Sequence, residues 1–384
     1  MSNAAVTIPL SEPCIRGNAS AYLDECLRTN FVSSVGPFVE RFEREFADYV
    51  GSKHAVACAS GTAALHVAMR LLGISAGDEV LVPTLTFIAS ANPVVYERGT
   101  PVLVDAEEQT WNMDPALVVD ELESRARTGR KMPAAVEVVH ILGHPADIDP
   151  IVDVCARFGV PIIEDAAEAL GARYADGSAA GKQVGTIGKI GCFSFNGNKI
   201  ITTGGGGMIT TDDPALAKRA KHLTTQARLP GAAYRHDEIG FNYRLTNVAA
   251  ALGVAQLELL PEFLVTKQRW ARNYDQALAG IPGIALAART PWATPTFWLY
   301  TVRVDAARYG LDRDATLAKL GRAGAQARPI WSPLHTMPMY AHAPRLGGAV
   351  AERIFSEALS LPSSVSMTEQ DQERVVAALT TRGT

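Results

Sequence analysis

The chain has few cysteines, little excess charge and no long hydrophobic run, and each of these absences excludes a class of protein. Of its 384 residues, five are cysteines, and no two of them form a Cys-x-x-Cys pair. We therefore predict neither a disulfide framework nor a cysteine-based zinc site. The formal net charge is only −4, so charge gives no reason to expect nucleic acid as a partner.

The features of membrane and secreted proteins are also missing. No run approaches the roughly 18 consecutive apolar residues of a spanning helix. The first residues lack a basic segment followed by an apolar one. We therefore expect a cytoplasmic protein with reduced thiols and no membrane partner. Hydrophobic residues make up 47 % of the chain and charged residues 20 %, which is typical of a globular protein with a large core.

Strands and helices are predicted to alternate through the first half of the chain. Apolar residues recur every four positions from Phe38 to Val50 and predict an amphipathic helix that ends at Gly51. Predicted strands cover residues 55–59, 79–82, 101–104, 135–140 and 160–164, and predicted helices cover 61–72, 88–96 and 150–158. This alternation predicts a parallel or mixed sheet covered by helices on both faces.

The second half of the chain is predicted to form a smaller unit. Helical signal dominates residues 245–280, and residues 300–304 form a β-branched, strand-like run among several prolines. We therefore expect a large α/β domain over residues 1–255 and a smaller C-terminal α+β domain over 256–384.

The most informative segment is Gly191–Met208, which holds Lys199 among small residues. Ser194 precedes the lysine and four consecutive glycines, 204–207, follow it; the acid Asp165 ends a predicted strand upstream. A pyridoxal phosphate enzyme needs a lysine that binds the cofactor covalently, an acid for the ring nitrogen, phosphate donors and a stacking residue. Lys199 and Asp165 are the candidates for the first two.

Acidic residues around Asp165 leave alternatives open. Asp165 precedes an alanine-rich stretch and taken alone would be assigned as a helix cap; its combination with Lys199 favours the cofactor role. Glu164 belongs to the strand and should point to the opposite side. Glu168 could reach the ring hydroxyl or could occupy a solvated helix position, and the sequence does not separate the two.

A Ser-Gly-Thr turn is the candidate for the phosphate site. Gly61 and Thr62 lie at the start of a predicted helix, where free N–H groups and the helix dipole attract anions. Ser194 can add a hydroxyl, although such a turn is also a routine helix cap. Phe87 follows a predicted strand and could stack on the ring, whereas a lone phenylalanine there is more often part of the core.

Two other patterns resemble binding motifs but are not interpreted as such. The glycines of Gly204–Gly207 are not a dinucleotide fingerprint, because no strand-turn-helix unit with a downstream acid accompanies them. The loosely metal-like spacing of His140, His144 and Asp147 falls at a strand end and turn, so structural histidines are expected there. We predict no metal site.

Five motifs in a fixed order resemble a known family. They are Ser-Gly-Thr-Ala-Ala-Leu-His, Pro-Thr-Leu-Thr-Phe-Ile-Ala-Ser-Ala-Asn, Glu-Asp-Ala-Ala-Glu-Ala-Leu-Gly, Ser-Phe-Asn-Gly-Asn-Lys-Ile-Ile-Thr-Thr-Gly-Gly-Gly-Gly-Met and Gly-Phe-Asn-Tyr-Arg-Leu-Thr-Asn. Together they resemble the DegT/DnrJ/StrS sugar aminotransferases, and the likeness covers nearly the whole chain. The resemblance implies the aspartate aminotransferase fold (fold type I), with a large, mostly parallel-sheet domain and a smaller C-terminal α+β domain.

The resemblance also implies roles for individual residues. It makes Lys199 the residue that binds pyridoxal 5′-phosphate, Asp165 the partner of the ring nitrogen and Phe87 the stacking residue. The phosphate is placed against Gly61, Thr62 and Ser194. A homodimer with shared active sites is implied, in which Asn242 reaches the phosphate of the partner subunit; from the sequence alone, Asn242 would be a turn residue.

Two departures from the family pattern point to a subgroup. Asn196 stands where many relatives carry histidine, and Glu168 where many carry glutamine. The Asn-Gly-Asn-Lys form resembles enzymes that act on UDP-linked 4-keto-6-deoxy-N-acetylhexosamines. The expected reaction moves an amino group from glutamate to C4 of such a sugar, giving a UDP-4-amino-4,6-dideoxy sugar for surface glycan synthesis.

Two other functions are weighed against this one. Relatives that dehydrate or deoxygenate sugars replace the cofactor-binding lysine with histidine, so Lys199 counts against that activity. A non-catalytic regulatory protein of the same fold would not need Lys199, Asp165 and the phosphate site intact.

Candidate substrate contacts come mainly from the C-terminal part. Arg328 and His335 could recognise the glutamate carboxylate or the nucleotide diphosphate, because arginine forms bidentate contacts with both groups. A surface arginine and a loop histidine are the alternatives. Asn196 and Arg244 are further candidates, although Arg244 could instead tie a subunit interface together. Trp331 could pack on a sugar or uracil ring or lie in the core.

Overall fold

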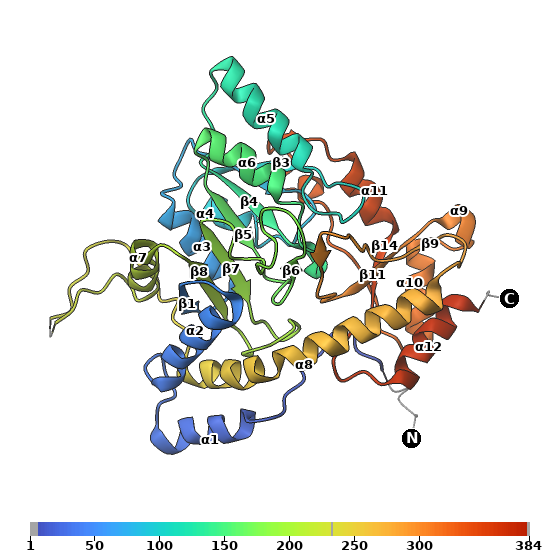
Figure 1. Ribbon diagram of the computed structural model, residues 1–384, viewed down its shortest axis with the longest axis horizontal. Coiled ribbons are helices and arrows are strands. Elements are labelled where there is room, and N and C mark those ends of the chain that lie inside the picture. Colours follow the sequence, from blue (N-terminus) through green and yellow to red (C-terminus); the bar gives the residue numbers. More distant parts are fainter. Residues whose placement is uncertain (1–6, 232, 382–384) are drawn as a thin grey trace.

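A central eight-stranded sheet organises the larger part of the molecule (Figure 1). The computed structural model describes residues 7–231 and 233–381. The strand order is β1-β8-β7-β5-β4-β2-β3-β13, and only β8 runs against its neighbours. The strands are β1 (His54–Cys58), β2 (Glu79–Pro83), β3 (Thr100–Val104), β4 (Ala135–Val139), β5 (Ile162–Asp165), β7 (Ile190–Ser194), β8 (Gly207–Thr211) and β13 (Arg345–Leu346).

Helices cover both faces of this sheet, as the alternating pattern predicts. Its central strands are buried on both faces, which explains their continuous runs of β-branched residues. One face packs against α3 (Gly61–Leu71), α4 (Asn92–Tyr96) and α7 (Pro214–Thr224). The other packs against α2 (Pro37–Val50), α5 (Pro115–Thr128), α6 (Asp149–Phe158) and the first half of α8 (Asn247–Leu278). The predicted helix over 88–96 begins only at Asn92, because Pro93 suits the first turn of a helix and residues 88–91 form turns.

The C-terminal part forms the expected α+β unit around its own small sheet. The strand order is β12-β14-β11-β9, all antiparallel, and a separate ladder pairs β6 with β10. These strands are β6 (Arg173–Tyr174), β9 (Ile284–Ala285), β10 (Ala293–Thr294), β11 (Tyr300–Val304), β12 (Arg328–Pro329) and β14 (Ala358–Leu361). The remaining helices and 3₁₀ turns are α1 (Ala19–Thr29), α9 (Ala306–Tyr309), α10 (Arg313–Arg322), α11 (Ala349–Glu357), α12 (Glu369–Thr380), η1 (Ile141–Gly143) and η2 (Leu334–Thr336).

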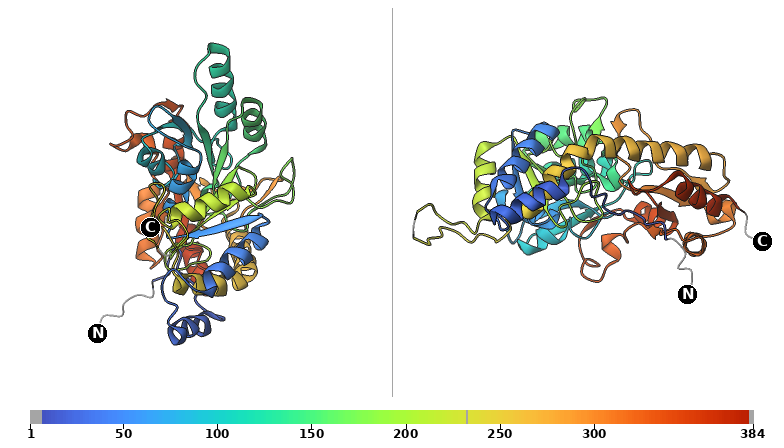
Figure 2. Two further views of the ribbon diagram at one scale, coloured as in Figure 1. Left: turned by 90° about the vertical axis from the view of Figure 1, so that its left-hand side faces the viewer. Right: turned by 90° about the horizontal axis from the view of Figure 1, so that it is seen from below.

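The long helix α8 connects the two parts and runs across the molecule (Figures 1 and 2). It packs against α1 and α2 at one end and α12 at the other. By length and composition alone it could cross a membrane, and half of its most apolar window is buried inside the fold. The predicted domain boundary at residue 255 falls within this continuous helix, and it remains a prediction.

Candidate active site

A cavity of about 320 Å³ lies at the carboxyl ends of β5 and β7, where open α/β sheets bind ligands. The N-terminus of α3, the chain before β11 and the chain around β12 all contribute to its lining. Eight of the predicted residues line it, namely Gly61, Thr62, Phe87, Asp165, Glu168, Ser194, Asn196 and Lys199, and Arg328 joins them from the small sheet. Residues far apart in the sequence are therefore brought together here.

Lys199 lies in the loop that follows β7, with its side chain largely enclosed. Its Nζ lies 3.9 Å from Oε1 of Glu168 and 4.1 Å from the ring centroid of Trp298. Burial lowers the pKa of Lys199, while the charges of Glu168 and Asp165 oppose that shift. A lysine with a lowered pKa is a better nucleophile and base at neutral pH.

Asp165 is the last residue of β5 and is held by two donors. Its Oδ2 accepts a hydrogen bond of 2.8 Å from the Ser90 hydroxyl, and its Oδ1 accepts one of 3.1 Å from the N–H of Ala167. Burial raises the pKa of Asp165, and the bond from Ser90 works against this. The helix-cap alternative is wrong, because no helix lies between β5 and β6 among the described residues.

Glu164 points to the opposite side of the sheet, as predicted. It pairs with Nε2 of His140 at 3.0 Å and accepts bonds from the N–H groups of Gly185 and Gly188. His140 is therefore a structural residue. Within residues 7–231 and 233–381, no group of three His, Cys, Asp or Glu side chains is arranged to hold a metal ion.

Glu168 is buried beside Lys199, so the solvated-helix alternative is wrong. Its Oε2 accepts a 2.7 Å hydrogen bond from the N–H of Leu142, and its other oxygen, Oε1, faces Nζ of Lys199. Leu142 has a φ of 57°, an unusual conformation for a branched side chain. Burial raises the pKa of Glu168 to about 7, and the charge of Lys199 opposes the shift.

The turn at Gly61 is both a helix cap and a space for a small anion. Ser60 caps α3 by accepting a 3.0 Å bond from the N–H of Ala63. A β-carbon on Gly61 would lie 2.8 Å from Cβ of Ser194, so only glycine leaves room between the two segments. The helix N-terminus, the hydroxyls of Thr62 and Ser194 and this missing β-carbon fit a phosphate group. With Lys199 and Asp165 on the same cavity, the residues present fit pyridoxal phosphate.

Aromatic residues complete the cavity. Phe87 is half exposed and makes an edge contact with Trp331, with ring centroids 6.4 Å apart. Trp331 in turn stacks on Trp298 at 6.1 Å with an interplanar angle of 11°. Two residues that contact the candidate residues, Trp298 beside Lys199 and Ser90 beside Asp165, were not among the sequence predictions. Trp298 has no local signal in the sequence, whereas Ser90 lies within the motif that holds Phe87.

Three predicted residues lie outside this cavity. Asn242 and Arg244 lie near the base of the segment between α7 and α8, where Nη2 of Arg244 donates to Oδ1 of Asn242 at 3.3 Å. His335 is buried, and its two ring nitrogens lie 2.6 Å from Oγ1 of Thr84 and 2.9 Å from Oε1 of Glu352. We correct the expectation for His335: both nitrogens are occupied, so it is a structural residue and no longer a candidate substrate contact.

Comparison with known proteins agrees with this geometry. The model of the DegT/DnrJ/EryC1/StrS aminotransferase family matches residues 13–380. The "Putative pyridoxal phosphate-dependent aminotransferase EpsN" of Bacillus subtilis is 42 % identical over 97 % of this chain and 95 % of its own length. A GDP-perosamine synthase of Caulobacter vibrioides is 43 % identical over 97 % of both chains. The crystal structure of S. venezuelae DesV superposes with a TM-score of 0.84 at 35 % identity, covering 94 % of this chain and 93 % of its own.

These matches extend over nearly the whole chain and confirm the predicted fold, the aminotransferase activity and the pyridoxal phosphate cofactor. The finer assignments, to individual site residues and to one sugar, go beyond these matches and are proposals. The chain belongs to the DegT/DnrJ/EryC1/StrS aminotransferase family.

Proposed function

We propose that the protein transfers an amino group from glutamate to C4 of a nucleotide-linked 4-keto-6-deoxy sugar. The observation that carries this proposal is the cavity itself. Lys199 and Asp165 line it together with Trp298, Trp331 and Arg328 of the small-sheet part, and Nζ of Lys199 lies 4.1 Å from the ring centroid of Trp298. The lysine and the acid suit the cofactor, and the aromatic rings with the exposed arginine suit a sugar and an anionic group. The name of a GDP-perosamine synthase among the relatives supports the nucleotide-sugar class.

Each residue has a defined task in this reaction. When bound, pyridoxal phosphate carries the amino group and makes a carbon of the substrate acidic. Nζ of Lys199 binds the cofactor at rest and, once released, accepts and returns the proton that moves during transfer. Asp165 keeps the ring nitrogen protonated, and the hydroxyl of Ser90 keeps Asp165 ionised. Gly61, Thr62 and Ser194 bind the phosphate, and Phe87 and Glu168 contact the ring.

Arg328 is proposed to bind the anionic part of each substrate in turn. Its guanidinium is exposed at the mouth of the cavity, where it can reach a carboxylate of glutamate or a diphosphate. Asn196 lines the same cavity and is a second candidate for the sugar. The predicted nucleotide is UDP, attached to an N-acetylated hexose. The relatives named GDP-perosamine synthases favour GDP as a second candidate.

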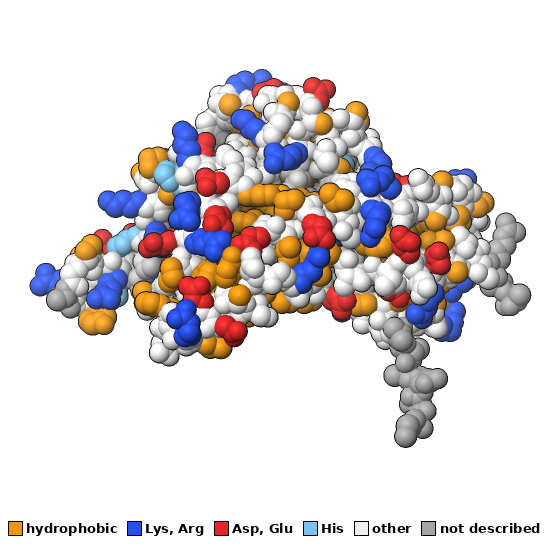
Figure 3. All heavy atoms as spheres, turned by 60° about the horizontal axis from the view of Figure 1, so that its bottom comes forward, with side chains coloured by type: hydrophobic (Ala, Val, Ile, Leu, Met, Phe, Trp, Pro, Cys, Tyr) orange, Lys and Arg blue, Asp and Glu red, His pale blue; other side chains and the backbone are white. Residues whose placement is uncertain are grey.

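A homodimer in the cytoplasm is part of the proposal. Apolar side chains are exposed along the N-terminal segment, at Ile15, Leu27, Phe31, Val32 and Val35, and Figure 3 shows hydrophobic side chains among charged ones on the face with α1 and α8. The segment between α7 and α8 extends away from the body (Figure 1) and exposes Tyr234 and Ile239. Both surfaces suit contact with a second subunit.

Visible spectroscopy followed by product analysis tests the function. The purified protein with pyridoxal phosphate should show a visible band that glutamate bleaches, and Lys199→Ala should show neither this band nor turnover. Addition of the UDP-linked 4-keto sugar should restore the band, and the GDP-linked sugar serves as the competitor. A band that glutamate leaves unchanged would exclude glutamate as the donor. Turnover by Lys199→Ala would overturn the assignment of the lysine.

A further inference from the structure

Lys267, in the middle of α8, is a buried lysine with an unusual set of partners. Its side chain is 3 % exposed. Its Nζ donates to the carbonyl oxygens of Trp298 at 2.8 Å and Ser363 at 2.5 Å, and the described residues record no ion pair for it. Burial lowers the pKa of Lys267 to about 7. A buried amine without a carboxylate partner costs stability.

One of the two carbonyls belongs to a residue that contacts the catalytic lysine. Besides accepting from Lys267, Trp298 donates from its indole N–H to the carbonyl of Asn198 at 2.6 Å. Its ring lies against Nζ of Lys199 at 4.1 Å and stacks on Trp331. Trp298 is therefore held at two points, its backbone by α8 and its side chain by the loop that carries Lys199.

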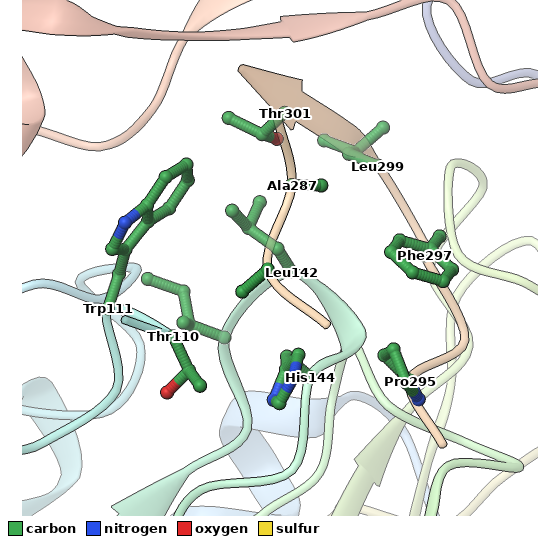
Figure 4. Close-up of a pocket in the computed structure, with 11 residues that line it drawn as sticks. Thr110, Trp111, Leu142, His144, Ala287, Pro295, Phe297, Leu299 and Thr301 are labelled. Carbon is green, nitrogen blue, oxygen red and sulfur yellow. The ribbon is translucent and has the colours of Figure 1, made fainter. Parts of the chain in front are cut away.

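A small cavity and a strained backbone conformation occur in this buried part of the chain. Phe297 and Leu299, on either side of Trp298, line a cavity of about 30 Å³ together with Leu142 and Trp111 (Figure 4). Phe297 has a φ of 51°, a strained conformation for an aromatic residue that persists only when the surroundings hold it. The bond from Lys267 to the next carbonyl along the chain supplies such a restraint.

The second carbonyl that accepts from Lys267, that of Ser363, connects this lysine to the rest of the small sheet. Ser363 follows β14, and its hydroxyl accepts a 2.9 Å bond from the N–H of Tyr300, the first residue of β11. Its N–H donates to the carbonyl of Leu10 at 2.8 Å. The ammonium of Lys267 thus joins the chain before β11 to the chain after β14, at the edge of the active site.

We propose that Lys267 is a positioning residue for the reaction, holding the backbone of Trp298 so that the indole ring stays against Lys199. The proposal rests on the proposed role of Lys199. A cation is stabilised by the face of an aromatic ring, so the position of Trp298 affects how readily the nitrogen of Lys199 stays protonated. Lys267 acts through Trp298 and touches neither cofactor nor substrate.

A double-mutant cycle tests this chain of contacts. Lys267→Met and Trp298→Phe should each lower kcat about tenfold and move the pH midpoint of the visible band to lower pH. The double variant should be no worse than the poorer single variant, because both remove one contact. Effects that multiply would show that Lys267 does not act through Trp298 and would overturn the proposal. Gln268→Met is the matched control, since the neighbouring Gln268 donates to the carbonyl of Pro295 instead, and it should leave the band unchanged.

A measurement on the protein without cofactor separates this proposal from the proposed function. The emission of Trp298 is obtained as the difference between proteins with and without Trp298→Phe. In the Lys267→Met background this emission should move to longer wavelength as the indole becomes more exposed to water; an unchanged emission would overturn the proposal. Lys267→Gln keeps an amide donor, so it should fall between wild type and Lys267→Met in every readout. If Lys267→Met does not fold, the emission of Lys267→Gln tests in its place whether Lys267 holds Trp298. A wild-type protein without any visible band would instead count against the role of Lys199.

Discussion

The carboxylate of Asp165 depends on one neighbouring hydroxyl. Ser90 donates to it at 2.8 Å inside the fold, and this bond opposes the rise in the pKa of Asp165 that burial causes. Ser90→Ala should therefore raise the pKa of Asp165, so that the acid side of the kcat/KM profile moves to higher pH. At pH 6 we expect kcat/KM to fall about tenfold, which corresponds to the free energy that a hydrogen bond to a charged group contributes.

A pH profile of kcat/KM for Ser90→Ala and wild type checks this prediction. Thr301→Val removes another buried hydroxyl, one that bonds to Ser360 in the small sheet, and controls for the general cost of such a change. An acid limb that stays in place in Ser90→Ala would mean that Asp165 is kept ionised by something other than this hydroxyl.

Glu168 should make the stability of the cofactor-free protein depend on pH. Its carboxyl has a pKa of about 7 in the fold against an ordinary value of 4.5, so the folded state binds an extra proton between these pH values. The stability that the neutral carboxyl contributes is present below pH 4.5 and is lost as pH rises through 7. The side chain of Glu168→Gln cannot ionise. The free energy of unfolding of this variant relative to that of wild type should therefore rise by up to about 3 kcal/mol between pH 4.5 and 8.

Urea unfolding of both proteins at several pH values measures this difference. Glu373→Gln, at an exposed position of α12, controls for the loss of one carboxylate. If the difference between Glu168→Gln and wild type stays constant across the range, the carboxyl of Glu168 is not held neutral by the fold.

Single residues also show what the sequence could and could not reveal. Lys199 and Asp165, which line the same cavity, could be selected as candidates because their motifs combine an informative residue type with a local pattern. Trp298 could not, since its place against Lys199 depends on bonds from α8 and from Asn198, which are distant in the sequence. For His335 the prediction was wrong because the partners that occupy its ring, Thr84 and Glu352, lie on other elements.

At the scale of elements, the start of α3 is shaped by one glycine. A β-carbon on Gly61 would approach Cβ of Ser194 to 2.8 Å, whereas alanine suits the helix itself. Gly61→Ala should therefore keep the helix but close the space proposed for the phosphate. We expect the affinity for pyridoxal phosphate to fall about 10- to 100-fold, the range set by overpacking a buried site.

Titration of the cofactor-free protein with pyridoxal phosphate, followed by absorbance, gives this affinity. Gly321→Ala is the matched control because a β-carbon on Gly321, in α10, would meet nothing within 4 Å. Equal affinity for Gly61→Ala and wild type would place the phosphate elsewhere in the cavity.

The elements that the sequence predicted well are those whose signals are local. The helix over 37–50 and the strands over 79–83 and 162–165 have the spacing or the β-branched runs of their class. The two-residue strand β13 has no such signal, because it exists only through its pairing with β3. The small sheet was expected only in outline for the same reason: three of its four strands have two or four residues.

At the scale of the whole molecule, the proposed phosphate contact of Asn242 requires a second subunit. Asn242 does not line the cavity of its own chain. It lies near the base of the segment between α7 and α8, which extends away from the body (Figures 1 and 2). If this segment crosses to a partner, each active site combines Lys199 of one subunit with Asn242 of the other.

A mixed dimer tests this arrangement. Lys199→Ala and Asn242→Ala should each abolish or strongly reduce activity as homodimers. In a dimer with one subunit of each kind, one site has both changes, and the other has a wild-type Lys199 and a wild-type Asn242. Such a dimer, purified with two different affinity tags after co-expression, should therefore recover about half of the wild-type activity. If Asn242 served the site of its own subunit, both sites of the mixed dimer would be damaged and its activity would not exceed the mean of the two parents.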